Sequence, residues 1–305
     1  MAKKLNWVTM ITPYKLNGEV DYECIDKIVE WYIENKVTAI FAVCQSSEIF
    51  YLTLDERIKI AQRVVKAVNG RVPVAVSGHV SDDIKSQIIE LREMSKVGAD
   101  AVAMISNRLA KAGESDDVWI SNAKKILDAI PDVDFGVYEC PYPYKRLMSE
   151  KVIKWCIETG RFTFTKDTCC DLESLKKRID LTRGTNFKIY NANTTTLLES
   201  LRYGADGFCG IMLNFHPELY YYISEHFSEF DNPKLELYNK FATVASLIEY
   251  QLYPINAKYN MQINGVDISL NSRSKPCPIF PENFRQEVRD MDALWKTLKE
   301  ITKEV

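Results

Sequence analysis

The chain has 305 residues, of which 46% are hydrophobic and 27% are charged, and its formal net charge is −3. These values exclude the disordered and fibrous classes, and the length suits one large α/β barrel or two small domains. Acidic and basic residues are interspersed without a basic stripe, so nucleic acid and anionic membranes are poor candidate partners. We expect a small-molecule ligand.

The beginning of the chain enters a strand-like segment at once, without the apolar region of a secretion signal. No stretch approaches the roughly 20 apolar residues that a membrane span requires. The 8 cysteines are scattered through apparent core segments, so reduced thiols are expected. Together these features predict a cytoplasmic protein without a membrane segment.

The sequence has no pattern typical of a bound metal or nucleotide. Cys169 and Cys170 are adjacent rather than spaced as in a zinc motif, and His79, His216 and His226 lie far apart. The first strand candidate is not followed by Gly-x-Gly-x-x-Gly, and a phosphate loop is also absent. We therefore predict neither a metal nor a cofactor. A serine or cysteine nucleophile system stays open, although no Gly-x-Ser-x-Gly elbow occurs.

Short apolar and β-branched runs alternate with segments of helical spacing along the first two thirds of the chain. The helical segments include residues 22–35, 54–68 and 81–97. Repetition of a strand followed by a helix predicts a closed parallel (β/α)8 TIM barrel, and an open doubly wound sheet is the alternative. The strand candidates are residues 7–12, 39–44, 72–77, 101–106, 135–140, 162–166, 187–191 and 207–212.

Only helical patterns follow the last strand candidate. We expect a barrel core with the active site over residues 1–214, and an eighth helix with a C-terminal all-helical extension over residues 215–305, which is not an independent domain. The extension is predicted to contain helices at 217–230, 233–253 and 284–304 and an irregular stretch at 256–281. Apolar positions expected to pack against the barrel or another subunit are Leu237, Phe241, Val244, Leu247 and Ile248.

Lys166 is the unusual residue of the sixth strand candidate. Alternation of side chains along a strand places Phe162, Phe164 and Lys166 on one face, which predicts an amine inside the protein beside two phenyl rings. Burial disfavours the charged ammonium, and a neutral amine is a nucleophile that forms a Schiff base with a carbonyl substrate. The alternative is a lysine that extends to solvent or pairs with a carboxylate.

Other polar residues follow the ends of predicted strands, where a (β/α)8 barrel carries its catalytic groups. Tyr138 lies near the end of the fifth strand candidate and is either a proton-transfer group or an aromatic residue that fills the top of the barrel. Ser46 and Ser47 follow the second strand candidate, and their hydroxyls either bind a carboxylate or cap a helix. Thr168 comes two residues after Lys166. A carboxylate site, a phenol and a buried lysine together predict an enzyme that forms a Schiff base with a pyruvate-type ketone.

These motifs resemble the dihydrodipicolinate synthase and N-acetylneuraminate lyase family over the length of the chain. Members of this family are class I (Schiff-base) aldolases, with a (β/α)8 barrel and a C-terminal helical extension. The most specific similarities are Tyr138-x-x-Pro141 and Lys166-x-Thr168. The others are residues 8–13, 54–56, 204–207 and 253–258.

The resemblance implies a role for each matching residue. Lys166 corresponds to the Schiff-base lysine, Tyr138 to the proton-relay tyrosine, and Ser46 to the hydroxyl that binds the substrate carboxylate. Cys209 stands where the backbone lies near bound pyruvate. The predicted substrate-binding residues are Gln45, Ser46, Ser47, Thr168 and Cys209. The resemblance also implies a homo-oligomer, a tetramer or a dimer.

The chain also departs from the family pattern. Residues 44–48, Cys-Gln-Ser-Ser-Glu, lack both glycines of the family loop. Pro143 replaces an arginine that holds the semialdehyde carboxylate in the synthase, and residues 106–111 lack the synthase's tyrosine. Thr194 and Thr195 replace the acidic pair of the sialic acid lyase. We expect an aldolase or dehydratase that acts on a 2-oxo acid through Lys166, with dihydrodipicolinate synthase proper or a catalytically silent 2-oxo-acid binder as alternatives.

Overall fold

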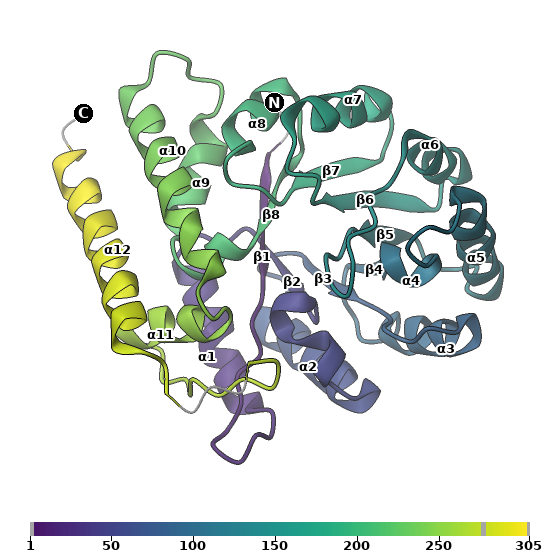
Figure 1. Cartoon of the computed structure of the whole chain (residues 1–305), viewed down its shortest axis with the longest axis horizontal. Helices are drawn as coiled ribbons and strands as arrows, with labels where there is room; N and C mark the ends of the chain where they lie inside the picture. The colour runs from purple at the N-terminus through teal and green to yellow at the C-terminus, as the bar shows by residue number, and fades with distance from the viewer. Residues whose placement is uncertain (1–2, 276–278, 304–305) are drawn as a thin grey trace.

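The computed structural model describes residues 3–275 and 279–303. Within these residues, eight parallel strands pair in chain order, and the last pairs with the first to close a barrel (Figure 1). This architecture confirms the predicted (β/α)8 fold. The strands are β1 (Leu5–Thr9), β2 (Ala39–Ala42), β3 (Val74–Ser77), β4 (Ala101–Ile105), β5 (Phe135–Tyr138), β6 (Phe162–Asp167), β7 (Lys188–Asn191) and β8 (Gly207–Gly210).

Helices surround the barrel. The barrel helices are α1 (Tyr22–Glu34), α2 (Leu54–Val68), α3 (Ile84–Met94), α4 (Ser106–Leu109), α5 (Asp116–Ala129), α6 (Glu150–Thr159), α7 (Leu172–Thr182) and α8 (Leu197–Tyr203). Of these, α1, α2, α3, α6 and α7 begin at a residue whose side chain caps the helix. Thr53 and Glu56, for example, form a reciprocal capping box at the start of α2. None of the helices in the described part of the chain is long and apolar enough to cross a membrane.

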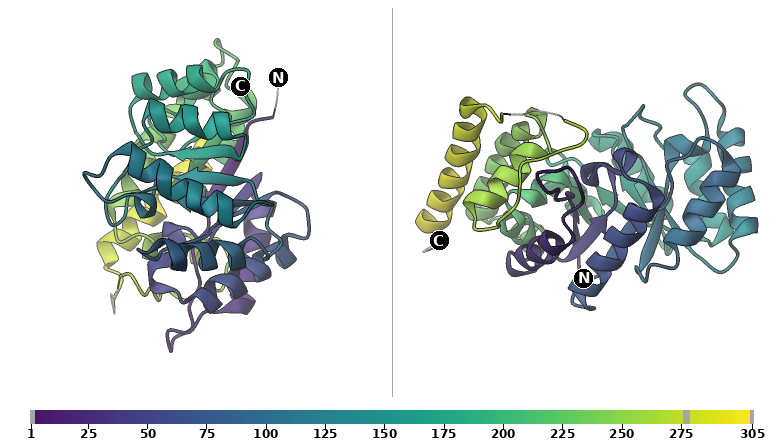
Figure 2. Two further views of the ribbon diagram at one scale, coloured as in Figure 1. Left: turned by 90° about the vertical axis from the view of Figure 1, so that its right-hand side faces the viewer. Right: turned by 90° about the horizontal axis from the view of Figure 1, so that it is seen from below.

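The extension follows β8 and lies on one side of the barrel, with its last helix outermost (Figure 2). Its helices are α9 (Pro217–His226), α10 (Pro233–Ala245), α11 (Ile255–Ile263) and α12 (Glu282–Ile301). The predicted boundary between the barrel core, residues 1–214, and the extension, residues 215–305, stays a prediction. Of the predicted elements, residues 276–278 of the irregular stretch and residue 304 of the last helix lie outside the described residues.

Two details of the extension differ from the expectation. The helix predicted over 233–253 ends at Ala245 and continues as a short 3₁₀ helix, Ser246–Tyr250. The stretch predicted to be irregular from residue 256 begins instead with α11. Pro254 precedes the first residue of α11, where its missing N–H group removes no helical hydrogen bond. The Asn, Gly, Ser and Pro residues of 256–281 predicted an irregular stretch, but the first of these residues belong to α11.

The pairing of β5 with β6 contains a register shift between Phe135 and Gly136. Phe162 pairs with Phe135 and Phe164 pairs with Gly136, so β6 has one extra residue at this point. As a consequence Phe162 faces outward and packs against the rings of Trp119 and Trp155 on α5 and α6. The prediction that Phe162 shares the interior face with Lys166 is therefore wrong.

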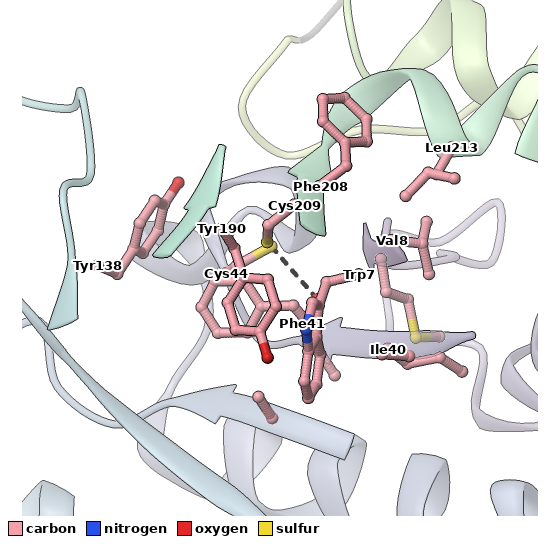
Figure 3. Packing of buried hydrophobic residues seen from close by; sticks show 14 of the residues in the cluster. Trp7, Val8, Ile40, Phe41, Cys44, Tyr138, Tyr190, Phe208, Cys209 and Leu213 are labelled. Carbon is pink, nitrogen blue, oxygen red and sulfur yellow. Dashed lines mark hydrogen bonds between the residues drawn. The ribbon is translucent and has the colours of Figure 1, made fainter. Parts of the chain in front are cut away.

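Phe164 does face the interior, where aromatic rings fill the barrel. Its ring centroid lies 6.4 Å from that of Trp7 and 6.1 Å from that of Tyr190. Gly136 leaves room for the ring, since a Cβ atom there would lie 2.1 Å from Phe164. Figure 3 shows Trp7, Tyr190 and Cys209 gathered inside the barrel. Because these side chains pack the interior, a ligand has room only beyond the carboxyl ends of the strands.

Candidate active site

A cavity of about 350 Å³ lies at the carboxyl ends of the barrel strands. Lys166 and Tyr138 line it from β6 and β5, and Ser46 and Gln45 line it from the loop after β2. Thr168 also reaches the cavity, so five of the seven residues predicted for the site meet in one space. The extension closes part of the cavity with Glu249, Tyr250, Tyr253, Pro254, Ser274 and Lys275.

Lys166 and Tyr138 are register partners on adjacent strands. The lysine Nζ lies 4.6 Å from the centroid of the Tyr138 ring and 5.8 Å from that of Phe41, and the residue is only 5% exposed. Within the described part of the chain, the amine has no hydrogen bond and no ion pair. Burial raises the pKa of Tyr138 well above its usual value, so the phenol keeps its proton at neutral pH. The arrangement combines a free amine with a proton donor.

A buried ion network holds the two strand ends that carry this pair. Arg178 of α7 donates to the carboxylates of Glu139 and Asp167, with 2.9 Å between its Nη1 and Glu139 Oε1. Its other amino group donates to the carbonyl of Met148 at 2.8 Å. Burial and the neighbouring Asp167 raise the pKa of Glu139 to about 7. Since Glu139 follows Tyr138 and Asp167 follows Lys166, the guanidinium fixes both catalytic candidates through their neighbours.

Thr168 is bound into the same strand ends. Its hydroxyl donates to the Glu139 carbonyl at 2.9 Å, and its N–H donates to the Glu139 carboxylate at 2.8 Å. Lys145, which also lines the cavity, donates to the Thr168 carbonyl at 2.9 Å. The threonine hydroxyl therefore supports the backbone beside Lys166.

The two serines of the loop after β2 differ in orientation. Ser46 lines the cavity, whereas the Ser47 hydroxyl donates to the Met10 carbonyl at 2.6 Å and accepts from Cys44 N at 3.1 Å. Ser47 is not among the residues that line the cavity. Gln45 also lines the cavity, and its Oε1 accepts a hydrogen bond of 3.4 Å from the Cys140 thiol. The Ser46 hydroxyl, which interacts with the Tyr253 side chain, and the Gln45 amide thus face the cavity from this loop.

The same loop begins and ends in left-handed backbone. Val43 has a φ of 52° and Glu48 a φ of 61°, a region that favours glycine and is costly for a β-branched residue. Contacts of the Glu48 carboxylate hold its end in place. Oε2 accepts from Ser272 Oγ at 2.8 Å, from Arg273 N at 2.8 Å and from Ser274 N at 2.6 Å. These bonds join the loop to the extension.

Cys209 and Thr194 lie near the cavity without lining it. Cys209 is buried on β8 beside Trp7, and burial raises the pKa of its thiol to about 12. The next residues, Gly210 and Ile211, line the cavity instead. The Thr194 hydroxyl lies 2.8 Å from the Tyr220 hydroxyl and is buried. Among the described residues, no group of three or more His, Cys, Asp or Glu side chains is arranged to hold a metal ion.

Sequence reasoning missed the cavity residues that come from the extension. Glu249 and Tyr250 end the 3₁₀ helix, and Tyr253 follows. The Tyr253 hydroxyl accepts from Asn214 Nδ2 at 3.2 Å. Burial raises the pKa of the Glu249 carboxyl to about 7, although the nearby Lys166 charge opposes this shift. The only signal in the sequence was the motif at residues 253–258, which gave no reason to assign Glu249 to the site.

A closed (β/α)8 barrel with polar side chains around a cavity at the strand ends defines an enzyme of the TIM-barrel class. The profile of the dihydrodipicolinate synthetase family matches residues 4–292, and the chain belongs to this family. It is therefore a lyase of that family. A 4-hydroxy-tetrahydrodipicolinate synthase of Clostridium perfringens (strain ATCC 13124) is 27% identical over 259 residues, which are 84% of this chain and 86% of the relative.

Solved structures share the fold at lower sequence identity. A dihydrodipicolinate synthase of Acinetobacter baumannii, complexed with pyruvate, is 21% identical, with a TM-score of 0.83, and the match covers 95% of this chain and 98% of the other. A catalytic-lysine mutant of the sialic acid aldolase of Ruminococcus gnavus is 16% identical, with a TM-score of 0.86, over 98% and 97% of the two chains. These likenesses support the barrel architecture with its extension.

Proposed function

We propose that the protein is a Schiff-base aldolase or dehydratase that binds pyruvate or a related 2-oxo acid through Lys166. The observation that carries this proposal is the buried Lys166 amine, which has no hydrogen bond or ion pair within the described part of the chain and faces the Tyr138 ring in the cavity. A structural lysine in such a place would be expected to have a carboxylate partner, because an unpaired buried charge is costly. A nucleophilic lysine, in contrast, needs an amine that is not held by a carboxylate, so that it can attack a carbonyl carbon.

In the proposed reaction, the Lys166 amine attacks the ketone carbon and forms a carbinolamine. Tyr138 donates a proton to the carbinolamine oxygen, which leaves as water, and the product is a protonated imine. This imine withdraws electrons from the adjacent carbon, so a proton or a C–C bond there breaks to give an enamine. Tyr138 is protonated at neutral pH and therefore suits the donor role. The imine itself is the electron sink, so the chemistry requires no metal.

We assign the carboxylate of the 2-oxo acid to Ser46 and Gln45. Both line the cavity at the loop after β2, and a hydroxyl and an amide N–H are suitable donors to a carboxylate. Ser47 holds the loop against Met10, and Thr168 holds the β6 end against Glu139. Cys209 would form part of the barrel interior beneath the ligand. Ser47 and Cys209 do not line the cavity and would support the site, whereas Thr168 lines it and stays a candidate for substrate binding.

The relatives supply two further arguments. The Acinetobacter baumannii neighbour is complexed with pyruvate, and the Ruminococcus gnavus neighbour has a catalytic lysine. Dihydrodipicolinate synthase proper is the second candidate, because the curated relatives carry that name. Lysine biosynthesis fits less well, since Pro143 replaces the expected arginine and residues 106–111 contain no tyrosine. A cytoplasmic homo-oligomer is also expected, and light scattering of the purified chain would measure its size.

Exchange of the pyruvate methyl protons in D₂O separates an enzyme from a silent binder. Enamine formation replaces the methyl protons by deuterium, whereas binding alone leaves them unchanged. We expect the wild-type protein to catalyse exchange, visible by proton NMR, and Lys166→Ala to abolish it. A wild-type protein that binds pyruvate without any exchange would favour the silent binder.

A further inference from the structure

Two glutamates line the cavity, and their surroundings differ. The Glu48 carboxylate accepts three hydrogen bonds from residues 272–274 and lies 3.6 Å from Lys258 Nζ. Glu249 belongs to the 3₁₀ helix Ser246–Tyr250 of the extension. Across residues 3–275 and 279–303, its carboxylate has no hydrogen bond and no ion pair. Glu48 is therefore a structural group, whereas Glu249 keeps its full capacity to accept hydrogen bonds.

Glu249 is half-buried, and this location makes the free carboxylate costly. Burial raises the pKa of Glu249 to about 7, and the Lys166 charge opposes this shift. A ligand that brings a hydrogen-bond donor would replace the missing water contacts. A ligand that brings a second carboxylate would add repulsion in the same poorly solvated space.

None of the basic residues of the cavity forms an ion pair with Glu249 in the described structure, although the Lys166 charge acts to lower the pKa of this carboxyl. Lys166 lies over the rings of Tyr138 and Phe41 and forms no ion pair in the described structure. In the proposed reaction the Lys166 nitrogen is neutral once the protonated imine has become an enamine, and the enamine is the species that meets the second substrate. Lys145 and Lys275 are exposed, so water screens their charges. Among the acidic residues that line the cavity in the described structure, Glu249 is the one whose carboxylate has no hydrogen bond or ion pair.

Aromatic side chains form part of the remaining walls of the cavity. Phe50 and Tyr142 are in edge contact, with 5.0 Å between the ring centroids, and Tyr51 and Tyr250 line the same space. Aromatic faces pack well against the C–H groups of a carbon chain. A short chain with hydroxyl groups has both features that these walls recognise, since it offers C–H groups to the rings and O–H groups to Glu249.

We propose that Glu249 determines the second substrate, by accepting a hydrogen bond from a hydroxyl group beyond the aldehyde carbon and by repelling a carboxylate at that position. This inference rests on the proposed function, because the second substrate meets an enamine on Lys166. The enamine carbon forms a bond to the aldehyde carbon, and the aldehyde oxygen takes a proton. The product is an extended imine on Lys166. The second substrate is therefore a neutral, hydroxylated aldehyde.

The test uses the full chain with pyruvate and equal concentrations of two aldehydes, glyceraldehyde and succinic semialdehyde. Glyceraldehyde is neutral and hydroxylated, whereas succinic semialdehyde carries a carboxylate. After incubation, borohydride reduces the imines to stable amines, and the masses on Lys166 distinguish pyruvate alone from each extended product. In the wild-type protein we expect about ten times more of the glyceraldehyde product than of the succinic semialdehyde product. In Glu249→Gln this ratio should fall by about tenfold, so that the two products form in similar amounts.

Glu249→Gln should still form the adduct with pyruvate on Lys166, and the preference is therefore read as the ratio of the two extended products, which does not depend on the rate of the first step. The matched control is Glu225→Gln on α9, an exposed glutamate that does not line the cavity and should keep the wild-type preference. Equal use of the two aldehydes, no extended product, or an unchanged preference in Glu249→Gln would overturn this inference alone. Absence of any pyruvate adduct in the wild-type protein would overturn the proposed function as well.

Discussion

Lys166 lies over the ring of Tyr138, with 4.6 Å between Nζ and the ring centroid, because the two residues are register partners on β6 and β5. The extra residue near the start of β6 turns Phe162 toward the helices and leaves Phe164 and Lys166 on the interior face. Side chains alternate along a strand, so one residue more or less decides which face the lysine occupies. The register shift is thus part of how the chain builds the site.

Replacing Tyr138 by phenylalanine removes the proton donor and keeps the ring beside Lys166. We expect the imine with pyruvate to form still, while turnover slows by roughly 10²–10⁴-fold, as is typical for loss of a general acid or base. Methyl-proton exchange measures the rate. Tyr190→Phe is the matched control, because Tyr190 is buried in the barrel but does not line the cavity. Normal exchange by Tyr138→Phe would contradict the proton-relay role.

Replacing Arg178 by methionine leaves the carboxylates of Glu139 and Asp167 buried without their cation. Breaking a buried ion pair in this way costs about 3–5 kcal/mol of unfolding free energy. Urea denaturation measures the loss. Arg183→Met on the same part of the chain is the control, since its pair with Asp180 is more than half exposed and should contribute little. A loss below about 1 kcal/mol for Arg178→Met would show that the network does not hold the strand ends.

Acid should destabilise the protein partly through His216. Burial against Phe241 and Trp295 lowers the pKa of His216 to about 3, below its usual value of 6.5. The unfolded chain therefore binds more protons between these values, and stability falls as the pH drops below about 6.5. The loss from this residue is about 2 kcal/mol between pH 8 and pH 5.

His216→Phe should reduce that loss, because phenylalanine does not titrate and resembles the neutral imidazole in shape. The difference in unfolding free energy between pH 8 and pH 5, measured in urea, should be about 2 kcal/mol smaller than in the wild-type protein. His79 will keep part of the acid sensitivity, since burial also lowers its pKa, to about 4. His226→Gln, at a partly exposed position, is the control. An identical pH dependence in His216→Phe would refute this assignment.

Gly136→Ala should disturb the barrel interior, because its Cβ would lie 2.1 Å from the Phe164 ring. Overpacking of this kind costs about 1–3 kcal/mol. The double variant Gly136→Ala with Phe164→Leu removes the clashing ring atoms, and its cost should be smaller than the sum of the two single losses. Thermal or urea unfolding of the three variants tests this coupling, and simple additivity would argue against a direct clash.

The sequence was sufficient to predict the barrel and the meeting of Lys166 with Tyr138. Both predictions depend on local periodicity and on the rule that parallel strands end at one face. Local patterns could not show that Phe162 faces outward, because the register shift depends on how β5 and β6 pair. They also could not show that Ser46, but not Ser47, faces the cavity, since this depends on the backbone at Val43 and Glu48.

Contacts between segments distant in the sequence were the least predictable part of the site. Arg178 reaches Glu139 across 39 positions, and nothing in either local pattern indicates the partner. Glu249 enters the cavity from the extension, where a helical pattern predicted only packing. Such residues are identified by where the extension folds back on the barrel, which is a property of the whole chain.

Borohydride reduction in the presence of pyruvate, followed by peptide mass mapping, tests the central claim most directly. The proposed function predicts a covalent pyruvate adduct on the peptide that contains Lys166, at about one per chain, and no adduct in Lys166→Ala. Labelling of other lysines at similar levels, or an unmodified Lys166 in the wild-type protein, would contradict the assignment of this amine as the nucleophile.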